Sequence, residues 1–97
     1  MHLFVRPKMD ETATIIRRYI SEKILRANEY PFQDDASFLE KGIVDSLNLP
    51  LLVVFVEEQF GFRVNDADIV PRNFDSVSGL VSYVESMSPG IRHHSSK

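Results

Sequence analysis

Residues 38–61 read FLEKGIVDSLNLPLLVVFVEEQFG, and this stretch decides the fold. Its apolar side chains recur at spacings of three, one and four, which predicts the buried face of a helix. These side chains are Leu52, Phe55, Val56 and Phe60. Gly42 permits a turn before Ile43, and Gly61 stands where a left-handed helix cap costs least. We therefore expect a helix from about Ser46 to Phe60.

Pro50 bears on where this helix begins. Proline removes a backbone donor, disfavours helical geometry at the residue before it, and fits best at the first helical position. In an alternative, the regular helix begins nearer Pro50 and leaves Ser46, Leu47 and Asn48 in a looser or 3₁₀ turn.

Upstream, an apolar face with offsets of 0, 3, 7, 11 and 14 predicts a first helix, with Asp10 as N-cap and Asn28 at its stop. The face consists of Ala13, Ile16, Ile20, Ile24 and Ala27. The connection to Ser46 is then about seventeen residues, longer than most loops in compact domains. We expect its apolar side chains to pin it to the core. They are Phe32, Phe38, Leu39 and Ile43.

Downstream, Asp66 opens a short turn that must pause at Pro71, because the residue before proline avoids helical geometry. Asp75 is expected to cap a last helix with an apolar stripe of Val77, Leu80, Val81 and Val84. No hairpin signal or internal repeat is present, so a small all-α bundle is predicted. The expected core is Ile16, Ile20, Ile24, Leu52, Val56, Phe60, Leu80 and Val84. We expect one monomeric domain over 10–88, a flexible arm over 1–9 and a flexible tail over 89–97.

Composition excludes several classes of function. The 97 residues include no cysteine, so any thiol chemistry must come from a cofactor. Residues 29–88 hold eleven acids against three bases, a net charge of −8 that repels nucleic acid and favours basic partners. The apolar run 49–56 is too short to span a bilayer, and the N-terminal residues lack the apolar region of a secretion signal. A cytoplasmic protein is expected.

Asp45-Ser46-Leu47 gains meaning from its surroundings. A glycine stands four residues before Ser46, Phe60-Gly61 ends the following helix, and Asn73-Phe74-Asp75-Ser76-Val77 precedes the last one. This pattern resembles the acyl carrier protein and peptidyl carrier protein family over about residues 12–87. The resemblance implies a four-helix bundle with a long loop between the first and second helices. It also implies that a separate phosphopantetheinyl transferase moves 4'-phosphopantetheine from coenzyme A onto Ser46.

The position of Ser46 suits that modification. A hydroxyl where a loop meets a helix start should be exposed, and its phosphodiester should lie beside unpaired backbone N–H groups and the positive end of the helix dipole. The alternative is that Ser46 is only a capping residue. In the family, the acid matching Asp45 helps the transferase bind metal and substrate; a solvated capping acid is the other interpretation of Asp45.

The family presents one face of its second helix to partner enzymes, and here that face is Leu47, Leu51, Val54 and Glu58, with Glu57 beside it. This face is usually more acidic, so docking should depend more on apolar contact. The alternative is that the long loop buries Leu51 and Val54. The pattern looks closer to discrete aminoacyl or specialised-metabolite carriers than to the housekeeping fatty-acid carrier.

Intrinsic catalysis is not expected. The three histidines, His2, His93 and His94, lie in the expected flexible ends, where they can serve neither as a fixed base nor as a metal site. The predicted function is a non-catalytic carrier whose arm holds an acyl or aminoacyl group as a thioester for enzymes of fatty-acid, polyketide or nonribosomal-peptide type biosynthesis. Its predicted partners are the transferase and adenylating or acyltransferase loading enzymes. A discrete aminoacyl or peptidyl carrier is one alternative, an unmodified helical interaction domain another, and an enzyme a distant third.

Overall fold

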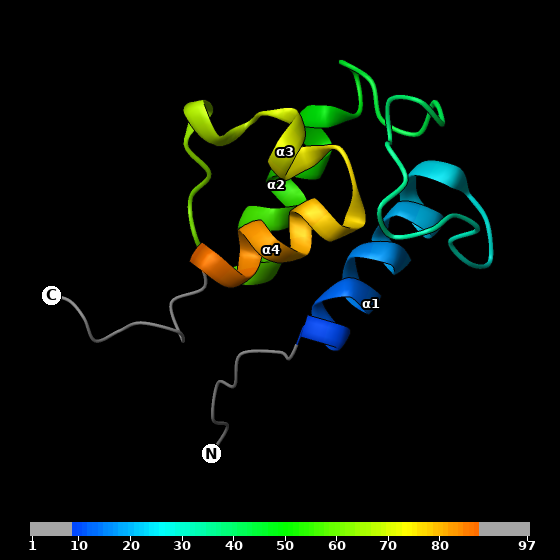
Figure 1. Ribbon diagram of the computed structural model, residues 1–97, viewed down its shortest axis with the longest axis horizontal. Helices are drawn as coiled ribbons and strands as arrows, with labels where there is room; N and C mark the ends of the chain where they lie inside the picture. The colour runs from blue at the N-terminus through cyan, green and yellow to red at the C-terminus, as the bar shows by residue number, and fades with distance from the viewer. Residues whose placement is uncertain (1–8, 88–97) are drawn as a thin grey trace, which may run out of the picture.

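The computed structural model describes residues 9–87, and within that range the chain is helical with no strand (Figure 1). The α-helices are α1 (Met9–Tyr19), α2 (Leu49–Phe60), α3 (Pro71–Phe74) and α4 (Val77–Met87). A π-helical segment, η1 (Ile20–Leu25), continues α1, and a 3₁₀ turn, η2 (Asp66–Asp68), precedes α3. The predicted all-α class is confirmed. The predicted flexible tail over 89–97, residues 1–8 of the predicted arm and the three histidines lie outside the described residues. Met9, which the prediction placed in the arm, is the first residue of α1.

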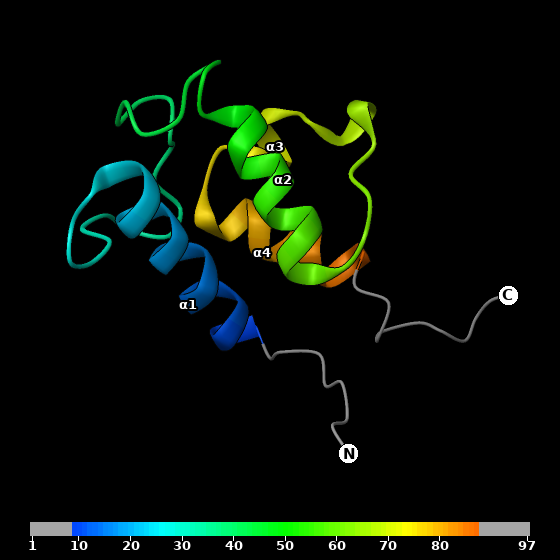
Figure 2. The ribbon, with the colours of Figure 1, turned by 180° about the vertical axis from the view of Figure 1, so that it is seen from behind.

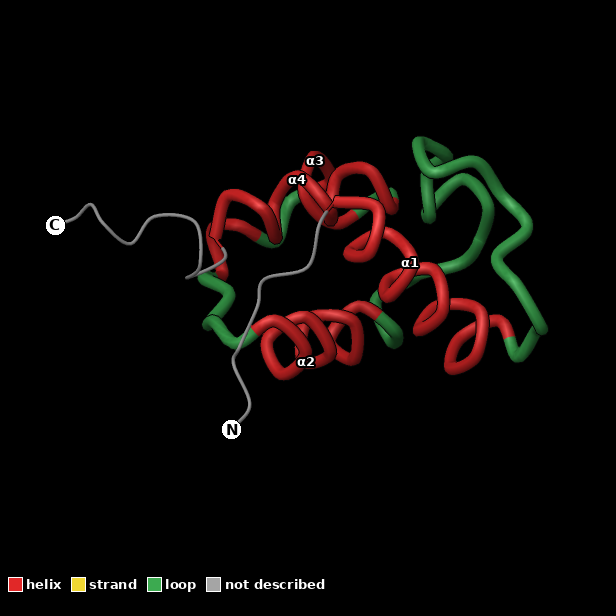
Figure 3. The backbone as a smooth tube through the Cα atoms, turned by 90° about the horizontal axis from the view of Figure 1, so that it is seen from below, coloured by secondary structure: helices red, strands yellow, loops and turns green. Residues whose placement is uncertain are grey.

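The helices surround one core. α4 packs against both α1 and α3, while α2 lies on the other side of the molecule (Figures 2 and 3). The ring of Tyr19 on α1 stacks on Phe55 of α2, with centroids 4.0 Å apart. Of the eight predicted core residues, seven are buried and Ile24 is half-buried. The apolar periodicity therefore placed the buried faces of α1, α2 and α4 correctly.

The first helix ends earlier than its periodicity predicts. Beyond Tyr19 the backbone widens into the π-helical η1, which ends at Arg26 in the left-handed conformation with φ of 57°. A π-helical turn holds more residues than an α-helical one, so later side chains rotate off the original face. Ser21 is consequently buried, whereas Ala27 is exposed and Asn28 is not the stop.

The start of this helix also differs from the prediction. Helix α1 already includes Met9, so Asp10 is its second residue and not its N-cap. Met9 stands four residues before Ala13, a spacing that continues the apolar face and that the prediction left out.

Residues 26–48 connect η1 to α2 without a regular helix and lie beside the C-terminal half of α1 (Figure 3). Phe38 and Ile43 enter the core as predicted, and Phe32 is half-buried against it. The prediction was wrong for Leu39, whose side chain is exposed. The connection is anchored at Asp34, whose carboxylate accepts two hydrogen bonds from Arg17 of 2.8 and 2.7 Å.

Helix α2 follows the alternative that Pro50 suggested. Regular helix begins at Leu49 and not at Ser46, so Pro50 lies in the first turn, where its missing donor costs least. At the other end Gly61 adopts φ of 78° and donates its N–H to the carbonyl of Glu57, as a left-handed cap does.

The segment after α2 corrects one capping assignment. Val70 is extended and Pro71 opens α3, as the proline rule predicts. Asp75, however, does not cap α4. The hydroxyl oxygen of Ser76 accepts the N–H of Gly79 at 2.9 Å, because Ser76 stands directly before the first helical residue, Val77. The carboxylate of Asp75 instead faces the connection between η1 and α2.

Candidate functional site

Ser46 is exposed in a hydrogen-bonded turn immediately before α2. Oδ1 of Asp45 accepts the N–H groups of Leu47 and Asn48 at 2.9 and 3.0 Å. The Asp45 carbonyl accepts the N–H of Leu49 at 2.9 Å. Asp45, the residue before Ser46, thus accepts all three of these N–H groups.

These contacts correct two expectations about Ser46. A capping serine would accept an N–H two or three residues ahead, from Asn48 or Leu49, but both donors are bound by Asp45. For the same reason, the N–H groups of Leu47, Asn48 and Leu49 are paired and do not lie open to a phosphate. Asp45 therefore caps this turn and Ser46 does not, while Asn48 stands at the N-cap position of α2.

The turn is also fastened to the core. The side-chain amide of Asn48 donates to the carbonyl of Ile43 at 3.1 Å, and Ile43 is buried. Val44, between Ile43 and Asp45, is buried as well, although its role was not predicted. Ser46 is therefore an exposed residue on a short turn whose two ends are held.

A cleft of about 320 Å³ adjoins Ser46. It is formed by the long connection, the start of α2 and the segment from η2 to α3. Most of its lining is apolar, and the residues are Leu39, Val44, Asp45, Ser46, Leu49, Ile69, Val70, Pro71, Phe74 and Asp75. Sequence reasoning missed the wall from residue 69 to 71. The apolar run Ile69-Val70-Pro71 belonged to no predicted helix face, and this was the feature of the sequence that could have indicated the wall.

The predicted partner face is exposed. Leu47, Leu51 and Val54 show 80%, 57% and 47% of their surface, so the alternative in which the long connection buries Leu51 and Val54 is wrong. Glu58 is exposed with them. Glu57, beside this face, is less exposed than Glu58. It is half-buried, and its Oε2 accepts the N–H of Val64 at 2.9 Å, which fastens the chain beyond the end of α2.

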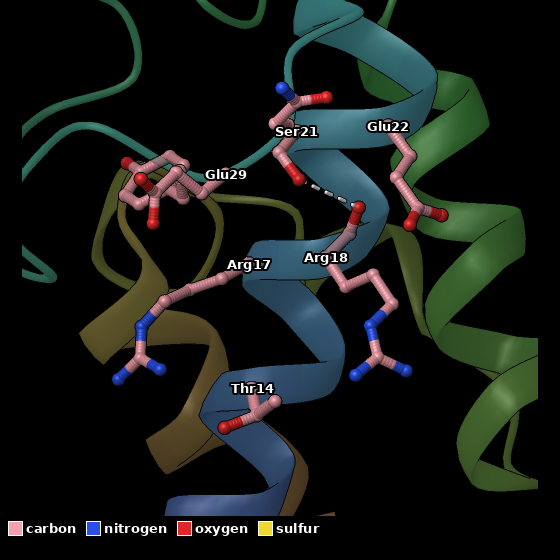
Figure 4. A pocket seen from close by; sticks show the side chains of 8 residues that line it. Thr14, Arg17, Arg18, Ser21, Glu22 and Glu29 are labelled. Carbon is pink, nitrogen blue, oxygen red and sulfur yellow. Dashed lines mark hydrogen bonds between the residues drawn. The ribbon is translucent and has the colours of Figure 1, made fainter.

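A second hollow, of about 250 Å³, lies along α1 and η1 (Figure 4). Figure 4 shows the side chains of Arg17 and Arg18 diverging from the helix, and the Ser21 hydroxyl donating to the Arg18 carbonyl at 3.1 Å. Glu22 and Glu29 also line this hollow, so its charges offset one another. None of the residues that line this hollow also lines the cleft beside Ser46.

Residues 9–87 contain no group of three or more histidine, cysteine, aspartate or glutamate side chains that could hold a metal ion. In that same part of the chain, no helix is long and apolar enough to cross a membrane.

Comparison with known proteins identifies the family. No family model matches the chain. The chain is 34% identical over 76 residues to an acyl carrier protein of Thermotoga maritima, an alignment covering 78% of this chain and 90% of the relative. The chain belongs to the acyl carrier protein family. An acyl carrier protein of Renibacterium salmoninarum is 36% identical over 52 residues, which cover 54% of this chain and 62% of that relative.

Membership in the acyl carrier protein family supports a carrier role for this chain. The described helices agree with the fold that the resemblance implied.

Proposed function

We propose that Ser46 carries a 4'-phosphopantetheine arm and that the chain presents an acyl or aminoacyl group to partner enzymes. The observation that carries this proposal is the exposed Ser46, on a turn that Asp45 alone caps, in a chain that belongs to the acyl carrier protein family. Because the capping donors are already paired, attachment at Ser46 would break none of the described hydrogen bonds of the turn.

Attachment is a phosphoryl transfer onto the hydroxyl of Ser46. Its Oγ forms a bond to the phosphorus of coenzyme A that bears pantetheine, and the pyrophosphate bond of coenzyme A breaks. Adenosine 3',5'-bisphosphate leaves with the bridging oxygen, and the hydroxyl proton passes to a base of the phosphopantetheinyl transferase. Asp45 holds the acceptor in place and, in this proposal, also helps the transferase bind its metal and substrate.

The residues around Ser46 fit such a group. An extended arm needs an open attachment point and room beside it, and Ser46 is exposed and adjoins the cleft. The arm supplies a terminal thiol that holds the cargo as a thioester at high effective concentration beside a docked enzyme. Because the chain contains no cysteine, this thiol belongs to the arm alone.

The partners proposed are the transferase and adenylating or acyltransferase enzymes that load the thiol, in biosynthesis of the fatty-acid, polyketide or nonribosomal-peptide type. They would dock on the exposed face formed by Leu47, Leu51 and Val54. This apolar face also favours a discrete aminoacyl or peptidyl carrier as a second candidate, since apolar contact rather than charge would select its partners.

The test is incubation of the purified chain with coenzyme A, magnesium and a broad-specificity phosphopantetheinyl transferase, followed by intact-protein mass spectrometry. We expect one phosphopantetheine on the wild type and none on Ser46→Ala. Ser76→Ala is the matched control, because Ser76 also follows an aspartate at a helix start but its oxygen caps α4. A wild type that several transferases leave unmodified, or an equally modified Ser46→Ala, would favour the unmodified interaction domain.

A further inference from the structure

A single aspartate, Asp75, clasps residues 37–40 of the long connection, which include Leu39 beside the cleft at Ser46. Oδ1 of Asp75 accepts the N–H of Leu39 at 2.9 Å, and Oδ2 accepts the hydroxyl of Ser37 at 2.5 Å. The backbone carbonyl of Asp75 accepts the N–H of Phe38 at 2.8 Å. The Ser37 oxygen in turn accepts the N–H of Glu40 at 3.1 Å. Residues 37–40 are thus fastened to the end of α3 by both the main chain and the side chain of Asp75.

The clasped segment contains two neighbouring apolar side chains, one of which is buried and the other exposed. Phe38 is completely buried, while Leu39 exposes 72% of its surface although its N–H is held in place. A loosely held leucine could turn toward nearby apolar surface, but the hydrogen bonds on both sides of Leu39 restrain its backbone. Leu39 is one of four large apolar side chains that the described residues leave exposed, together with Leu47, Leu51 and Val54.

The place of Leu39 indicates what binds there. Leu39 and Ser46 line the same cleft, so an enzyme that brings coenzyme A to the Ser46 hydroxyl must approach Leu39 closely. Leu47 is exposed immediately after Ser46. Glu40 and Asp45, each next to one of these residues in the chain, are exposed acids that complement basic groups.

We infer that Asp75 is a positioning residue, which holds Leu39 as the loop-side contact of the docking surface for the phosphopantetheinyl transferase. This inference rests on the proposed function of Ser46. The docking surface is therefore larger than the α2 face and includes Leu39. The transferase is expected to meet it with an apolar contact flanked by basic side chains.

The test is the rate of phosphopantetheine transfer at saturating coenzyme A, measured against the concentration of the carrier by intact mass. Leu39→Ser and Asp75→Ala should each raise KM for the carrier, by about tenfold if one good contact is lost, with little change in kcat. Asp75→Asn retains one acceptor oxygen and should restore part of the affinity. Because Asp75 acts through Leu39, the double variant should be no worse than the more affected single variant.

Asp34→Asn is the matched control. It loosens the same connection at its other anchor, the ion pair with Arg17, and should leave KM unchanged. Circular dichroism at the assay temperature checks folding. If Asp75→Ala does not fold, Ser37→Ala removes the hydrogen bonds of the Ser37 hydroxyl to Asp75 and to Glu40 and should still raise KM.

If Leu39→Ser and the clasp variants have the same KM as the wild type, the inference about Leu39 and Asp75 is wrong, but the proposed function of Ser46 still stands. The inference is also wrong if Asp34→Asn raises KM as much as the clasp variants do, or if the rise in KM of the double variant is the product of the two single rises. A wild type that is never modified on Ser46 would overturn the proposed function and the inference with it, and that outcome is visible before any variant is made.

Discussion

Phe38 and Leu39 are neighbours in the chain, yet they should respond oppositely to truncation. Phe38 is fully buried in the core although it lies in a segment with no regular helix. Replacing a buried phenylalanine by alanine costs about 3–5 kcal/mol, from lost transfer free energy and the cavity left behind. Since a small domain has a total stability of about 5–15 kcal/mol, Phe38→Ala should remove a large share of it. At about 4 °C or more per kcal/mol for a domain of this size, the melting temperature should fall by at least roughly 12 °C.

The assay is thermal and urea unfolding followed by far-ultraviolet circular dichroism. Leu39→Ala is the control, because an exposed side chain truncated on the surface should change the free energy of unfolding by no more than about 0.5 kcal/mol. Equal losses for the two variants, or a loss below about 1 kcal/mol for Phe38→Ala, would show that the connection does not contribute to the core.

Two further predictions concern caps and charge. Ser76→Ala should lower the free energy of unfolding by about 1 kcal/mol, measured by urea unfolding, because Ser76 rather than Asp75 caps α4; an unchanged urea midpoint would contradict that assignment. Hydrogen bonds from Arg17 hold the pKa of Asp34 below its ordinary value, so the stability from this pair is complete above about pH 4 and is lost as the pH falls through the lowered pKa. Both side chains are more than a third exposed, so the effect should be below about 1 kcal/mol. In a plot of the urea midpoint against pH, Asp34→Asn should flatten the fall at acid pH, and an unchanged fall would contradict the role of this pair.

The buried faces of the three longer helices and the end of α2 could be predicted from the residues alone. The core positions of α2 follow from the spacing of Leu52, Val56 and Phe60, and its end follows from Gly61, whose φ of 78° costs a glycine little. Pro50 and Pro71 mark helix starts because proline lacks an N–H and restricts the residue before it. All these signals act between residues that are close in the chain, so the sequence displays them directly.

The candidate site could be predicted in part from the sequence. The sequence predicted an exposed Ser46 at the entrance to α2 and an apolar face at Leu47, Leu51 and Val54, and these residues are exposed in the structure. It could not decide whether Ser46 or Asp45 caps the turn, because both residue types cap helices well. Hydrogen-bond geometry decided it in favour of Asp45.

The tertiary structure alone decided which side chains of the connection turn inward. Phe38 and Leu39 are both apolar, but only Phe38 enters the core. The N–H of Leu39 donates a hydrogen bond to the carboxylate of Asp75, which is 36 residues away in the chain. The π-helical η1 likewise changed which residues face the core, exposing Ala27 and burying Ser21. The cleft beside Ser46 depends on residues 69–71 meeting the connection across the fold. Local periodicity and capping signals cannot predict contacts between residues so far apart in the chain, because these contacts form only when the helices pack together.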